Sequence, residues 1–173
     1  MEKTKLGKSN LSVSKLGLGI GGVFGMHVFN ENKALSLIHK SIDLGLNFFD
    51  TGSSYSYGNA EIRLGKALQN KDKDSLVIAT KGGTVLKRGG GVIKNFSRQS
   101  LIKNLEKSLK NLRLEKIDLF QLHSPRLNDL NDEVIETLQL MKDSGKILNT
   151  GISCDGVLLK RVIDLGFFDT VMA

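Results

Sequence analysis

A chain of 173 residues has the usual length of one domain, and its 40% content of hydrophobic residues is enough for a sizeable core. The net charge of +7 could indicate a nucleic-acid partner, but the cations alternate with glutamates in stretches such as KNLEKSLKNLRLEK (103–116), which is typical of a solvated helix face. With no apolar leader, no run of about 18 apolar residues and a single cysteine, we expect a cytoplasmic protein that binds no membrane, no nucleic acid and no metal.

Short apolar segments that end in glycine or polar residues recur along the chain, as buried strands of a parallel sheet do. They span residues 15–20, 46–50, 76–81, 117–123, 147–153 and 167–172. Helical patterns lie between them, and Ser97 is placed to cap one helix while Gly145 is placed to end another. Residues 4–16 precede the repeat and read as a hairpin that could plug one end of a barrel. No linker interrupts the pattern, so we expect one domain over residues 1–173.

Two architectures fit such a repeat, an open doubly wound sheet and a (β/α)8 barrel. The stretch GLGIGG (17–22) matches G-x-G-x-x-G and superficially favours the first. In that motif, however, the helix begins at the glycines, whereas helical periodicity here starts only near Lys33. Asp50 also lies further from the first glycine than the motif requires. The sequence therefore favours a flexible strand-to-helix loop at this position over the dinucleotide-binding motif.

Polar residues close three successive predicted strands: Asp50, Lys81 and His123, with Tyr55 in the loop after Asp50. Each of these taken alone has an ordinary structural explanation, as a cap, a solvated strand end or a structural histidine. In a parallel barrel, however, the carboxyl ends of all strands meet at one face, so the four would share a pocket. We interpret them as a catalytic group.

The chemistry of these four residues is coherent. A phenol has a pKa near 10, so Tyr55 needs a nearby cation such as Lys81 to serve as a proton donor. A buried lysine in turn needs a carboxylate, for which Asp50 is available, and His123 could polarise a carbonyl oxygen. Because no side chain supplies a hydride, carbonyl reduction would also require a cofactor.

The same residues carry a resemblance to a known family. FDTGSSYSYGNAEIRLGKAL (49–68), IATKGG (78–83), LEKSLKNLRLEKIDLFQLHSP (105–125) and SGKILNTGISCDG (144–156) resemble, in order and spacing, the signature segments of the aldo-keto reductases. The resemblance implies an NADP- or NAD-dependent oxidoreductase on a (β/α)8 barrel that reduces aldehydes and ketones or runs the reverse reaction. It also implies roles for particular residues: Asp50, Tyr55, Lys81 and His123 as the catalytic tetrad, and Gly22, Asp50, Ser153 and Cys154 at the cofactor.

The chain departs from the family pattern at several positions. Ser56 replaces a glycine, and Tyr57 is a second candidate phenol, although spacing favours Tyr55. Cys154 replaces the asparagine that joins Ser153 on the nicotinamide carboxamide. An eight-stranded barrel typically takes about 250 residues, so we expect an incomplete barrel, whose open edges would promote self-association. The choice between NADP and NAD stays open.

Other functions remain open at this point. The chain could be a binding or regulatory subunit without turnover, as the family's potassium-channel β subunits illustrate, or an inactive fragment. A barrel enzyme that uses Lys81 as a Schiff-base amine would leave Asp50 and Tyr55 without a task. The glycine-rich stretch KRGGGVIKNFSRQS (87–100) points faintly to a sugar-like substrate.

Overall fold

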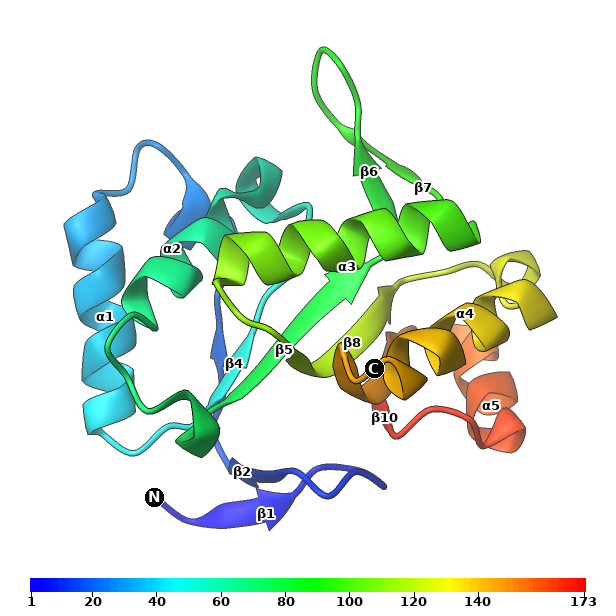
Figure 1. The fold of residues 1–173 in the computed structure, drawn as a ribbon, viewed down its shortest axis with the longest axis horizontal. Coiled ribbons are helices and arrows are strands. Elements are labelled where there is room, and N and C mark those ends of the chain that lie inside the picture. Colours follow the sequence, from blue (N-terminus) through cyan, green and yellow to red (C-terminus); the bar gives the residue numbers. More distant parts are fainter.

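A six-stranded parallel sheet organises the molecule, and the computed structural model describes all residues from 1 to 173 (Figure 1). Its strands are β3 (Leu18–Gly19), β4 (Phe48–Asp50), β5 (Val77–Gly82), β8 (Ile117–His123), β9 (Ile147–Ser153) and β10 (Thr170–Met172). They lie side by side in chain order, without the reversal that marks a doubly wound sheet. The predicted fold class, an incomplete barrel, is confirmed, because β3 and β10 each have a neighbour on one side only.

Five helices connect these strands: α1 (Glu31–Asp43), α2 (Asn59–Ala67), α3 (Arg98–Leu112), α4 (Asp132–Asp143) and α5 (Gly156–Leu165). Short 3-10 turns span Gly22–Gly25, Tyr55–Gly58, Lys73–Ser75 and Leu127–Asp129. The predicted cap is present, since the Ser97 hydroxyl accepts a hydrogen bond from the Ser100 amide. The GLGIGG stretch leads into one 3-10 turn, and α1 begins only at Glu31, as a strand-to-helix loop requires. None of the helices combines the length and apolarity needed to cross a membrane.

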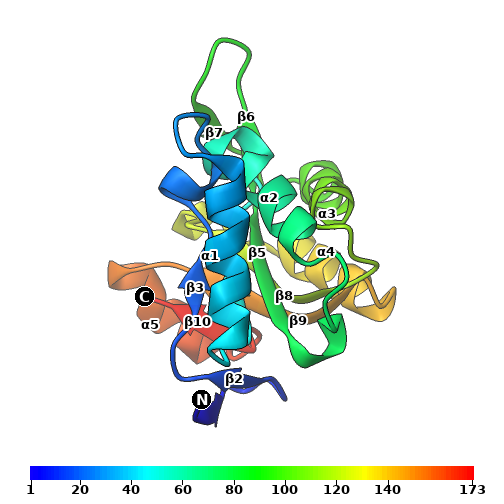
Figure 2. The ribbon, with the colours of Figure 1, turned by 90° about the vertical axis from the view of Figure 1, so that its left-hand side faces the viewer.

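Two hairpins stand at opposite ends of the sheet (Figure 2). Strands β1 (Lys3–Lys5) and β2 (Ser12–Ser14) form the predicted N-terminal hairpin. Strands β6 (Thr84–Leu86) and β7 (Val92–Lys94) form the second, which follows the carboxyl end of β5. The strands of the second hairpin were not predicted, although the three glycines at its tip, residues 89–91, all adopt positive φ and are a turn signal.

The apolar core lies between the sheet and the helices. Alternate strand residues such as Phe49, Ile78 and Phe120 point toward the helices and are fully or almost fully buried. At one point α2 and α3 come so close that only glycine fits, because a β-carbon built on Gly65 would lie 2.3 Å from the carbonyl oxygen of Asn111. Because these apolar strand residues point toward the helices, the opposite face of the sheet is free to carry polar side chains.

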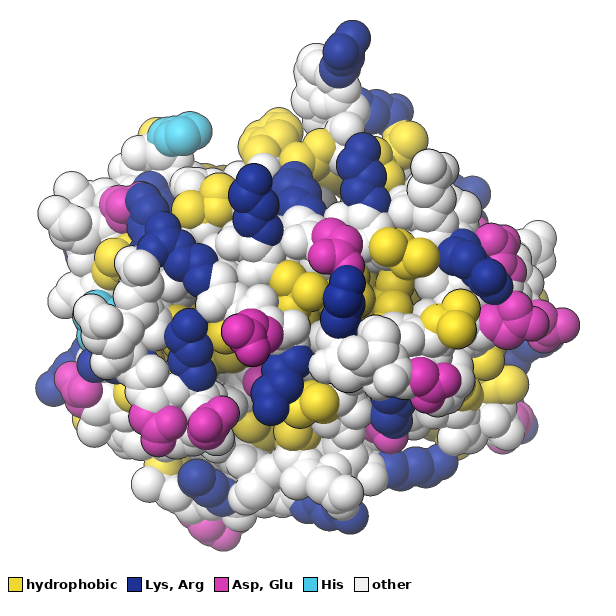
Figure 3. All heavy atoms as spheres, viewed as in Figure 1, with side chains coloured by type: hydrophobic (Ala, Val, Ile, Leu, Met, Phe, Trp, Pro, Cys, Tyr) yellow, Lys and Arg dark blue, Asp and Glu magenta, His cyan; other side chains and the backbone are white.

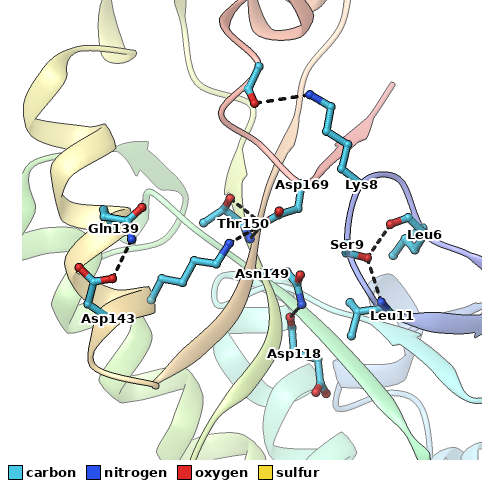
Figure 4. A network of polar contacts seen from close by, with 12 residues as sticks. Leu6, Lys8, Ser9, Leu11, Asp118, Gln139, Asp143, Asn149, Thr150 and Asp169 are labelled. Carbon is cyan, nitrogen blue, oxygen red and sulfur yellow. Dashed lines mark hydrogen bonds and ion pairs between the residues drawn. The ribbon is translucent and has the colours of Figure 1, made fainter.

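The N-terminal hairpin contacts the sheet near both of its open edges. On one side, the buried Asn47 before β4 accepts from the Ser14 amide at 2.6 Å and donates to the Ser12 carbonyl at 2.9 Å. On the other side, the Lys8 amide donates to the Asp169 carbonyl at 2.8 Å, just before β10. Figure 4 shows this second contact region, in which the Asp169 carboxylate accepts from the amide and the hydroxyl of Thr150.

Replacing Asn47 with alanine tests whether its hydrogen bonds hold the N-terminal hairpin against the sheet. The Ser14 amide would lose its partner in a buried position, so Asn47→Ala should lower the free energy of unfolding by about 1–3 kcal/mol. Urea denaturation measures the change. Asn10→Ala in the same hairpin is the control, because Asn10 is exposed. Equal effects of the two changes would contradict this role of Asn47.

Candidate active site

The predicted catalytic residues lie on one face of the sheet at the carboxyl ends of its strands. Strand register aligns Lys81 with Gln121, and His123 with Ser153. Asp50 is aligned with Ala79, two residues before Lys81, so alternation places these side chains on the same face. This is the face that carries no helices.

A buried ion pair forms the base of the site. The Lys81 side chain is only 2% exposed, and its Nζ donates to Asp50 Oδ2 and to the Thr51 carbonyl at 3.0 Å. The second carboxylate oxygen, Asp50 Oδ1, accepts from Gln121 Nε2 at 2.8 Å. Burial raises the pKa of the Asp50 carboxyl, while Lys81 and Gln121 act against that shift by stabilising the carboxylate.

The Tyr55 ring lies between the lysine and the histidine. Lys81 Nζ is 5.1 Å from the ring centroid, and the His123 ring meets it edge-on with centroids 5.4 Å apart. Two glycines form a flat seat for the ring, because β-carbons built on Gly21 and Gly52 would lie 3.2 and 3.3 Å from its atoms. Tyr55 therefore cannot move toward those backbones without a clash.

The second candidate phenol points elsewhere. Tyr57 is 67% exposed, and a β-carbon built on Gly90 in hairpin β6–β7 would lie 3.6 Å from the Tyr57 hydroxyl. Ser56, which replaces the family's glycine, has a φ of 49° and is held by a hydrogen bond from its hydroxyl to the Gly22 carbonyl at 2.8 Å. A left-handed conformation explains why glycine suits this position.

His123 is held in its neutral form. Burial lowers its pKa to about 4, and the nearby cations of Lys94 and Lys81 act in the same direction. The buried His123 Nδ1 has no hydrogen-bond partner, which favours the tautomer that carries its proton on Nε2. Lys94 Nζ donates to the His123 carbonyl and thereby ties β7 to the end of β8. At neutral pH the imidazole can donate one hydrogen bond without carrying charge.

The residues predicted at the cofactor differ in their surroundings. Ser153 shares the face of His123, and its hydroxyl makes no hydrogen bond within the chain. Gly22 has a positive φ of 48°. Cys154 instead packs into the hydrophobic core, where burial raises the pKa of its thiol and Asp155 adds to the shift. Their roles at a cofactor stay predictions.

Sequence reasoning missed three residues that build the site: Gln121, Gly21 and Gly52. Gln121 could have been predicted from the sequence, because a residue two positions before His123 on the same strand must share the face of His123. The two glycines gave no comparable signal, since their contact with Tyr55 depends on how two loops pack.

The fold and the site define a β/α-barrel protein with a phenol, an ion-paired lysine and a neutral imidazole at the carboxyl ends of its strands. The chain belongs to the aldo/keto reductase family, whose family model matches residues 15–162. It is 39% identical over 155 residues to the uncharacterized oxidoreductase YqkF of Bacillus subtilis, covering 88% of this chain and 49% of that protein. It is 26% identical over 190 residues to the NADH-specific methylglyoxal reductase of Escherichia coli, covering 100% of this chain and 58% of that protein.

A solved structure supports the same relationship. The holo form of aldo-keto reductase AKR11C1 from Bacillus halodurans superposes with a TM-score of 0.88 at 31% sequence identity. The match covers 99% of this chain and 56% of that one. The chain therefore spans about half the length of the relatives it matches.

Replacing Gln121 tests its support of Asp50. Gln121→Met removes a hydrogen bond to a buried carboxylate, so the free energy of unfolding should fall by about 1.5–3 kcal/mol at pH 7. The penalty should shrink near pH 4, because a protonated Asp50 needs the amide less. Urea denaturation at the two pH values measures it. Gln139→Met is the control: its 2.7 Å bond to Asp143 is exposed, so we expect a loss of about 0.5 kcal/mol or less. A pH-independent penalty for Gln121→Met would contradict this role.

The lowered pKa of His123 predicts a pH-dependent stability. The unfolded chain binds a proton at His123 near pH 6.5, whereas the folded chain does so only near pH 4. The free energy of unfolding should therefore be highest above pH 6.5, and it should fall as the pH drops toward 4, because only the unfolded chain gains the proton over that range. His123→Asn should remove that part of the pH dependence, as urea denaturation across the range would show. A wild type and a variant with parallel curves would exclude the burial of a neutral His123.

Proposed function

We propose that this chain carries the proton-transfer half of an oxidoreductase site that reduces aldehyde or ketone carbonyls to alcohols, or runs the reverse reaction. The observation that carries the proposal is the position of Tyr55 beside the Lys81 ammonium and the neutral His123 ring. Family membership and the methylglyoxal reductase among the relatives support it. The substrate would be a small carbonyl compound or alcohol.

The residues present fit the reactive end of a nicotinamide cofactor, NADP or NAD. The Ser153 hydroxyl makes no bond within the chain and shares the face of His123, so it is free to bind a carboxamide. Gly22 lies beside the Tyr55 loop, because its carbonyl accepts from the Ser56 hydroxyl, and a β-carbon built on Gly22 would meet nothing within 4 Å. When bound, the cofactor would supply the hydride, which no side chain can provide.

The chain's own residues then handle the proton. Tyr55 would donate its hydroxyl proton to the oxygen of the carbonyl being reduced, and Lys81 would stabilise the phenolate that remains. Asp50 pairs with Lys81 inside the protein, and Gln121 holds Asp50 in place. A neutral His123 would donate a hydrogen bond to the same carbonyl oxygen and fix its orientation. In the reverse direction, Tyr55 would act as the base.

Tyr55→Phe tests this function. It removes the proton donor and little else, so kcat for carbonyl reduction should fall by about 10²-fold or more while cofactor binding is retained. The assay follows the loss of NADPH or NADH absorbance with a panel of aldehydes and ketones. It uses the protein expressed from its whole reading frame, because the relatives are about twice as long as this chain.

Tyr57→Phe is the matched control. The exposed Tyr57 should tolerate the change, with activity within about twofold of the wild type. A large loss in Tyr57→Phe together with an active Tyr55→Phe would reverse the assignment. A wild-type protein that binds the cofactor but reduces no carbonyl would favour a non-catalytic binding subunit.

A further inference from the structure

A cavity lies outside the catalytic face, between the loop before Tyr55, the base of hairpin β6–β7 and helix α3. It has a volume of about 180 Å³. Its polar lining residues come from these three segments: Ser53 from the loop, Thr84 from the hairpin, and Ser100, Lys103, Asn104 and Lys107 from α3. None of them belongs to the proposed reaction.

Three hydroxyl groups of this lining are buried without a partner. Ser53 Oγ, Thr84 Oγ1 and Ser100 Oγ make no hydrogen bond within the chain, and the three residues are at most 8% exposed. Unpaired buried hydroxyls cost free energy, so their presence around one cavity points to a ligand that satisfies them. All three can donate a hydrogen bond.

The charged side chains that line the cavity are both cationic. Lys103 and Lys107 stand four residues apart on α3, where like charges repel, and neither makes an ion pair within 4 Å. The neighbouring Glu106 pairs with Lys146 instead. Figure 3 shows Lys and Arg side chains gathered over the region of α3 and the hairpin. No carboxylate lines the cavity to neutralise the two ammonium groups.

The remaining polar group of the lining is also a donor. Asn104 Oδ1 already accepts from the Gly83 amide at 2.8 Å, which leaves the Asn104 Nδ2 protons for a ligand. A lining of hydroxyls, one amide and two ammonium groups suits a ligand that only accepts hydrogen bonds. The volume is below the roughly 300 Å³ of a typical drug-sized site, so the ligand must be small.

We propose that this cavity binds a phosphate group, held by Lys103 and Lys107 and by the hydroxyls of Ser53, Thr84 and Ser100. The phosphate could be the free ion or part of a small phosphorylated molecule. Ser53 lies two residues before Tyr55, and its amide donates to the Lys81 carbonyl at 3.1 Å. A bound phosphate would therefore steady the loop that positions the catalytic phenol.

Equilibrium dialysis with radiolabelled inorganic phosphate tests the site. We expect saturable binding of one phosphate per chain, and a rise in Tm with phosphate that an equal ionic strength of sodium chloride does not reproduce. The double change Lys103→Gln/Lys107→Gln should weaken binding about tenfold or more. Lys40→Gln/Lys110→Gln, which removes two exposed lysines outside the cavity, is the charge-matched control and should bind as the wild type does.

Thr84→Val separates a phosphate site from a cavity that holds only water. The Thr84 hydroxyl has no protein partner, so this isosteric change should leave the stability without phosphate unchanged or higher, yet weaken phosphate binding several-fold. Water alone in the cavity predicts no saturable binding by the wild type, and that result would overturn the proposal. Equal losses in the two lysine pairs would overturn it as well.

A second ligand identifies the source of the phosphate. If glycerol 3-phosphate competes as well as inorganic phosphate, the site accepts the phosphate group of a larger molecule. If only inorganic phosphate binds, the free ion is the ligand. Either result supports the site, and neither depends on whether the protein reduces carbonyls.

Discussion

The burial of the Lys81 ammonium is the constraint on which the catalytic face depends. A lysine with 2% of its side chain exposed stays charged only if hydrogen-bond acceptors replace water around it. Asp50 and the Thr51 carbonyl provide them, and both belong to the end of β4 and the loop that follows. The ion pair therefore fixes the end of β4 against β5, and with it the start of the loop that carries Tyr55.

Neighbouring residues of a strand point to opposite faces of the sheet, so the candidate catalytic side chains and the side chains that pack against the helices lie on different faces. On β5, Lys81 faces the site while its neighbour Thr80 faces the helices, where its hydroxyl donates to the fully buried Glu61 at 2.7 Å. The other oxygen of Glu61 accepts from Asn111 on α3 at 3.0 Å. This buried carboxylate links β5, α2 and α3 on the side away from the site. The helices are thus held in place by contacts that do not compete with the catalytic residues.

Much of this arrangement was predictable from the sequence, because it follows from local patterns. The apolar segments, the cap at Ser97 and the polar residues at three strand ends all obey short-range rules. Hairpin β6–β7 was missed, although the three glycines at its tip marked a turn. Cys154 shows a different limit: the residue after Ser153 points away from it and packs into the core, which a motif comparison does not reveal. The seat of Tyr55 on Gly21 and Gly52 could not be predicted, since it depends on tertiary packing.

The N-terminal hairpin also has a consequence for the order of folding. Its contacts with the segment between α5 and β10 join residues far apart in the chain; the bond from Lys8 Nζ to the Gly166 carbonyl spans 158 residues. Contacts between such distant residues form slowly, because a long loop must close before they contribute. The hairpin precedes β10 in the chain, so during synthesis it emerges before that strand and cannot complete its contacts until the segment that leads into β10 has followed. The hairpin therefore reaches its final environment only after the segments of the chain between it and β10 have been made.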